Sequence, residues 1–133
     1  MRFEDWVDKI DGVMTALGFH RDNRISMDEP AQGKVYRLAP ADFGSQVELR
    51  NATGLSEVRV GIGMGLSMDA SGGNPFSTAT DLISRVEEVV DALLALNEPS
   101  TAGRGRIRIG DATMVHVEKT SNLWIALPLE VSY

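Results

Sequence analysis

The sequence predicts an α+β fold: a mainly antiparallel sheet of four to six strands with two helices packed on one face. Two segments carry apolar residues at helical spacing, whereas five or six others alternate apolar and polar residues. Several links between the alternating segments are short, which favours antiparallel neighbours. A chain of 133 residues with 43% hydrophobic content is also of the usual size for one domain, so we expect a single α+β domain over residues 1–133.

The first helix is the most clearly patterned element. Glu4 and Asp5 lie where acids favour the positive end of a helix dipole. Gly18 is well placed to end the helix. The opposite face is polar, so the pattern predicts a helix that buries one stripe, made of Phe3, Trp6, Val7, Ile10, Val13, Met14 and Leu17.

Three strands are predicted next, over residues 34–38, 46–50 and 57–64. Turn-rich links separate them, which predicts an antiparallel meander. In the third strand every second residue is apolar, while the other face carries three glycines. A strand so rich in glycine is weak unless something packs closely on its bare face, formed by Gly61, Gly63 and Gly65.

A second helix is predicted from Thr78 to Asn97, after a loop at residues 67–77. Thr78 and Asp81 match a capping box with Asp in place of Glu. The tail is again strand-like, over residues 106–109, 113–118 and 123–133. Gly110 and Asp111 indicate a turn or bulge, and Pro128 lacks an amide donor, so we expect it at an edge or beside a bulge.

No residue pattern predicts catalysis, a cofactor or a metal. Cysteine is absent, and the spacing Gly61-x-Gly-x-Gly65 matches neither a dinucleotide fingerprint nor a P-loop. His20 and His116 lie far apart, and only Asp111 and Glu118 neighbour His116. A small enzyme built on these groups is the weakest of three hypotheses, and we predict a protein without enzymatic activity.

The net charge of −6 excludes several classes of partner. The chain has thirteen basic and nineteen acidic residues, and no basic cluster of the kind that binds duplex DNA is visible in the sequence. We therefore expect no tight nucleic-acid binding. No apolar run is long enough for a membrane span, and the acidic start at Glu4 and Asp5 is unlike a signal peptide.

Two charged groups and the glycine face are candidates for a subunit interface. The three arginines alternate, so they project from one side of a strand, and the acids lie on the polar side of the second helix. Solvent exposure accounts for both groups, and an electrostatic docking surface is the alternative. The candidate residues are Arg104, Arg106, Arg108, Glu87, Glu88, Asp91, Gly61, Gly63 and Gly65.

The tail of the sequence carries a resemblance to a known family. A short charged strand (Arg106-Ile-Arg-Ile109) and then Val115-His-Val-Glu118 precede a strand of alternating apolar residues from Leu123 to Tyr133. This order resembles the tail terminator proteins of long-tailed bacteriophages. The resemblance implies a hexameric ring that caps the tail tube, stops its growth and joins the head, with the tail tube protein and a head-completion protein as partners.

The resemblance also implies a virion protein that assembles in the host cytoplasm, with no catalytic residues to carry over. The loop at residues 67–77 matches no family signature, which leaves the tube-facing surface unassigned. A small acidic adaptor or chaperone-like binding module is the alternative hypothesis, and we would expect it to be a dimer.

Overall fold

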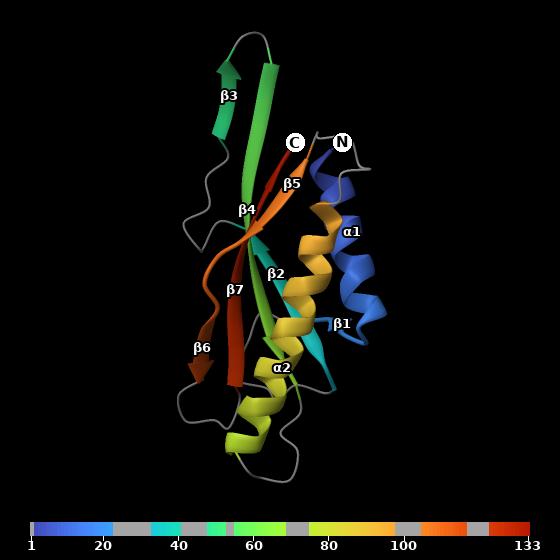
Figure 1. Cartoon of the computed structure of the whole chain (residues 1–133), viewed down its shortest axis with the longest axis vertical. Helices are drawn as coiled ribbons and strands as arrows, with labels where there is room; N and C mark the ends of the chain where they lie inside the picture. Colours follow the sequence, from blue (N-terminus) through green and yellow to red (C-terminus); the bar gives the residue numbers. More distant parts are fainter. Residues whose placement is uncertain are drawn as a thin grey trace.

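The computed structural model describes residues 2–22, 33–40, 48–52, 55–68, 75–97, 105–116 and 123–133. Two α-helices lie over one face of a sheet (Figure 1). The elements in chain order are α1 (Phe3–Ala16), β1 (His20–Arg21), β2 (Val35–Pro40), β3 (Glu48–Ala52), β4 (Leu55–Ser67), α2 (Pro75–Leu94), the 3₁₀ turn η1 (Ala95–Asn97), β5 (Arg106–Ile109), β6 (Thr113–His116) and β7 (Leu123–Ser132).

The described strands form one sheet in the order β1-β2-β4-β7-β5, with β3 paired to β4 and β6 paired to β7. Every pairing is antiparallel apart from β1 with β2. The predicted α+β class, the antiparallel character and the position of the helices are thus confirmed. The predicted meander is wrong, because β2 and β3 each pair with a different part of β4 and, among the described strands, not with each other. Six strands of four or more residues are joined by the two-residue β1, which the sequence pattern did not predict.

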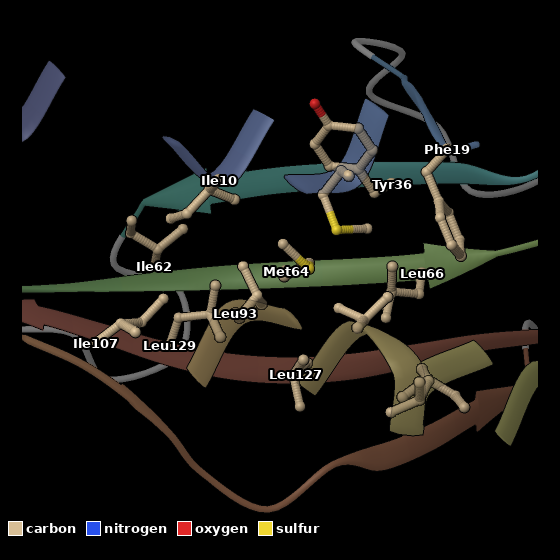
Figure 2. Packing of buried hydrophobic residues seen from close by; sticks show 14 of the residues in the cluster. Ile10, Phe19, Tyr36, Ile62, Met64, Leu66, Leu93, Ile107, Leu127 and Leu129 are labelled. Atoms are coloured by element: carbon tan, nitrogen blue, oxygen red, sulfur yellow. The ribbon is translucent and has the colours of Figure 1, made fainter. Parts of the chain in front are cut away.

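The core lies between the helices and the sheet (Figure 2). Trp6, Ile10 and Met14 of α1 are all buried, as the helical spacing predicted. The strands contribute every second residue, which is the periodicity of a pleated sheet with one buried face. That buried face includes Ile62, Met64 and Leu66 of β4 and Ile125, Leu127, Leu129 and Val131 of β7.

Gly18 ends α1 as predicted. Its φ of 86° is in the left-handed region, where glycine carries no steric penalty. The Gly18 N–H donates to the Thr15 carbonyl at 3.0 Å, and the Phe19 N–H donates to the Met14 carbonyl at 2.9 Å. These two hydrogen bonds give partners to carbonyls in the last turn of α1 that have none within the helix. The turn also directs Phe19 into the core.

The start of α2 corrects the sequence prediction. The helix begins at Pro75, so Thr78 and Asp81 lie inside it and do not form the predicted capping box. Proline suits the first turn because its fixed φ is helical and its missing N–H would have no partner there. Residues 69–74 of the predicted loop lie outside the described part of the chain.

A two-stranded extension projects beyond the end of β7 (Figure 1, top). Pairing between β4 and β7 stops at Arg59 opposite Ser132, whereas β3 pairs with β4 as far as Leu55. Within the described residues, 55–58 therefore have a strand on one side only. We call this extension, residues 48–52 and 55–58, the hairpin arm. It arises because β4 has 13 residues, many more than the predicted 57–64.

β5 and β6 both pair with the same side of β7 and are separated by a bulge. Ile109 pairs with Leu129 and Thr113 pairs with Ala126, so three residues on this edge oppose two on β7. The Gly110 N–H donates to the Pro128 carbonyl at 2.8 Å. Pro128 thus lies beside a bulge, as predicted, although β7 is an interior strand.

Asn97 covers the outer backbone of β5. Its Nδ2 donates to the Ile107 carbonyl at 2.8 Å, and its Oδ1 accepts from the Ile107 N–H at 2.8 Å. The amide thereby takes the place of a further strand at this edge. An edge whose backbone groups are already paired is a poor template for another chain.

Replacing Asn97 by leucine is expected to lower the free energy of unfolding by about 1–3 kcal/mol, because the Ile107 donor and acceptor lose their partners. Urea denaturation followed by circular dichroism measures this change. Leu96→Ala, at the neighbouring position of η1, reports the cost of truncating an apolar side chain in the same turn. An Asn97 variant as stable as the parent would contradict the role of the amide pair.

Candidate subunit interface

The arginines of β5 project away from the helices. Ile107 is buried beneath the helices with 1% of its surface exposed, so its neighbours in the strand face the opposite side of the sheet. Arg106 and Arg108 are both exposed there, as the alternation predicted. Glu130 of β7 lies opposite Arg108 in the register. Arg104 lies outside the described residues.

The predicted acids are exposed on α2. Glu87, Glu88 and Asp91 all lie on the surface, on the side of the helix away from the buried stripe of Leu82, Val86, Val89 and Leu93. Arg85 Nη1 lies 3.2 Å from a carboxylate oxygen of Glu88. Because both groups of this pair are about half exposed, the pair contributes little to stability.

The two charged groups lie on opposite sides of the sheet. α2 packs on the face that buries Ile107, whereas Arg106 and Arg108 extend from the outer face. The structure does not bring the arginines and the acids of one chain together. Any contact between these groups must therefore join two copies of the chain.

Gly65 of the glycine face is packed by the same chain. A Cβ built on Gly65 would lie 3.3 Å from Cε3 of Trp124, so the indole ring occupies the space that a side chain would fill. Close approach of this kind was expected for a strand with so many glycines. Gly63 is buried, and Gly61 and Gly65 are partly exposed. A subunit contact at these glycines remains a prediction.

The largely buried side chain of Arg37 stacks on Trp124. The Arg37 guanidinium carbon lies 4.7 Å from the centre of a Trp124 ring, a cation–π distance. Arg37 Nη2 lies 3.2 Å from Asp22 Oδ2, with side chains only 12% and 6% exposed. β1 positions Asp22, whose N–H donates to the Tyr36 carbonyl at 2.8 Å. Sequence reasoning missed this group, because no local spacing links the three residues.

A second polar contact ties α1 to the sheet. The Tyr36 hydroxyl donates to Asp11 Oδ1 at 2.6 Å, and Arg21 Nη1 lies 3.2 Å from Asp11 Oδ2. Burial, together with the Asp11 carboxylate, raises the pKa of Tyr36 above its usual value of 10.0. The phenol therefore stays protonated as a donor at neutral pH. Asp11 thus has a structural role, not a visible catalytic one.

The described residues contain no group of three or more His, Asp or Glu side chains that could hold a metal ion. His20 is exposed on β1, and His116 ends β6. Asp111 is exposed, and Glu118 lies outside the described segments. In that same part of the chain, neither helix is both long and apolar enough to cross a membrane.

Comparison with known proteins shows where the fold recurs. No protein-family profile matches the chain, and no curated protein matches it. Among solved structures, a chain in the virion of a native gene transfer agent particle is similar, with a TM-score of 0.57 and 21% sequence identity. The match covers 96% of this chain and 90% of that chain. The two chains thus share one fold over nearly their whole lengths.

Proposed function

We propose that this chain is a structural protein of a phage-like virion and that it assembles as a tail terminator. In this role, copies form a ring at the head-proximal end of the tail tube, stop its growth and join the head. The observation that carries the proposal is the fold shared with a virion chain over nearly the full length of both. The tail tube protein and a head-completion protein are the proposed partners, and assembly takes place in the host cytoplasm.

Charge supports this proposal in two ways. A net charge of −6 repels a polyanion, so DNA could pass through a ring of such subunits without being gripped. The basic strand face and the acidic helix face also lie on opposite sides of one chain. Contacts between two different patches build head-to-tail assemblies, which close into rings when the rotation permits.

Replacing both Arg106 and Arg108 by glutamate is expected to weaken self-association without unfolding the monomer. Each exposed ion pair contributes on the order of 0.2–1 kcal/mol, so the loss of two pairs corresponds to roughly 2- to 30-fold weaker association per contact. Adding Glu87→Arg and Glu88→Arg should partly restore assembly. Light scattering over a concentration series measures the change, and circular dichroism confirms the fold.

The charge-matched control is Arg2→Glu with Lys9→Glu, at the N-cap and in the first half of α1, which changes the net charge by the same amount and leaves β5 unaltered. This control should associate like the parent. If the Arg106 and Arg108 variant also associates like the parent, the arginines have no part in assembly. Negative-stain electron microscopy of the parent protein, alone and with the tail tube protein, tests the ring itself.

A further inference from the structure

β5 and β6 differ in how well their outer edges are protected from pairing with another strand. At β5, Asn97 pairs both backbone groups of Ile107, and Arg106 and Arg108 place charges beside the edge. Such devices discourage pairing with another strand. At β6 no such device is visible in the described residues. Met114 and Val115 are instead 44% and 39% exposed, on opposite faces of the strand.

The register shows which backbone groups of β6 are open. Gly110 donates to the Pro128 carbonyl, so Pro128 directs its backbone carbonyl toward this edge. The backbone groups of Ala126, two residues earlier, point toward the same edge, and Ala126 pairs with Thr113. Because alternate residues point to opposite edges, the N–H and C=O of Met114 face outward. In the described part of the chain, β6 pairs with β7 alone.

The hairpin arm carries the complementary open edge. Residues 55–58 of β4 pair with β3 on one side, and among the described segments no strand lies on the other side. The arm lies past the Ser132 end of β7, whereas β6 pairs with the Leu123 end. Met114 lies opposite Ile125, which is seven residues before Ser132 along β7, or about 23 Å at 3.3 Å per residue. The arm of one chain therefore cannot reach its own β6 (Figure 1).

We propose that the hairpin arm of one copy adds as a strand to the β6 edge of the next copy. Strand addition supplies main-chain hydrogen bonds to Met114, and it covers the exposed side chains of Met114 and Val115. The donor and acceptor surfaces differ, so the contact is head-to-tail. The proposal rests on the proposed function, because it names the contact that would link neighbouring subunits of the ring.

Disulfide trapping tests the contact cleanly, because the chain contains no cysteine. Met114→Cys is mixed with a larger, tagged chain that carries Ser56→Cys or Glu57→Cys in the arm, and the mixture is oxidised. Two arm positions are used so that a one-residue shift in register does not hide the contact. Paired strands hold opposite Cα atoms about 4.5–5.5 Å apart, within the range that a disulfide spans.

The expected result is a reducible mixed dimer of Met114→Cys with an arm variant, formed about tenfold more than with a tagged Ala16→Cys control on the exposed side of α1. Absence of the mixed dimer would overturn the proposal. A predominant Met114→Cys homodimer would also overturn it, because it would show two β6 edges pairing about a two-fold axis.

Electron microscopy of the parent protein separates this inference from the proposed function. Rings without the mixed disulfide would leave the ring standing and remove the arm contact. The mixed disulfide in open filaments would keep the arm contact and contradict ring closure. Each result thus decides one of the two proposals.

Discussion

Replacing Asp22 by alanine is expected to lower the free energy of unfolding by about 3–5 kcal/mol, because the change removes a carboxylate from a buried guanidinium. Asp22 and Arg37 lie 3.2 Å apart with side chains 6% and 12% exposed. In so little water, the attraction between the two charges is weakly screened, so removing the carboxylate takes a strong contact away from the guanidinium. Urea denaturation followed by circular dichroism measures the loss.

The chain offers a matched control for this experiment. Arg85 and Glu88 are also separated by 3.2 Å, but their side chains are 42% and 52% exposed. Glu88→Ala should therefore change the free energy of unfolding by only about 0–1 kcal/mol. Equal effects of Asp22→Ala and Glu88→Ala would show that burial does not set the strength of the first pair.

A second variant separates the cost of a buried charge from the cost of lost packing. Asp22→Leu combined with Arg37→Met removes both charges and keeps apolar volume at both positions. Such double replacements are often neutral or stabilising, so the double variant should be more stable than Asp22→Ala. A double variant less stable than Asp22→Ala would assign the effect to packing alone.

Replacing Trp124 by alanine is expected to cost about 3–5 kcal/mol of stability, the range for deleting a large buried aromatic side chain. Trp124 is 1% exposed, and its ring packs on Gly65 and under Arg37. Its deletion would open a cavity over Gly65, which has no side chain of its own to fill the space. Denaturant unfolding at a fixed protein concentration measures the effect.

Trp124→Phe is the informative companion variant. The indole nitrogen of Trp124 has no hydrogen-bond partner among the described residues, so phenylalanine loses ring area and no such bond. Trp124→Phe should therefore lose less than half as much stability as Trp124→Ala. Val115→Ala, opposite Trp124 but exposed, should change stability by less than about 0.5 kcal/mol. A Trp124→Ala variant as stable as Val115→Ala would contradict the packing role of the ring.

These residues divide the outer face of the sheet into two regions. Near the Leu123 end of β7, Trp124 and Arg37 are buried, and the glycine at position 65 is covered by the same chain. Near the Ser132 end, Arg106 and Arg108 are exposed on β5. The exposed arginines therefore remain open to a second chain, whereas the Trp124 region is already packed.

Several features of the fold followed from the sequence alone. The helical spacing of Trp6, Ile10 and Met14 determined the buried side of α1, because a regular helix repeats a face every three to four residues. The alternation from Leu123 to Tyr133 determined the buried side of β7 in the same way. Gly18 marked the end of α1, since it tolerates a positive φ. The alternation also placed Arg106 and Arg108 on one side of a strand.

Other features depended on the tertiary structure. Asp22 directly follows β1, whereas Arg37 lies in β2 and Trp124 in β7, and only the sheet order brings the three together. Asn97 meets Ile107 because α2 crosses the sheet and returns the chain beside β5. The hairpin arm exists because β4 extends past the end of β7. This offset is set by the pairing of the two strands, and the sequence of one strand does not reveal it. Periodicity reports which face of an element is buried, but the identity of the element packed against that face is set by long-range contacts.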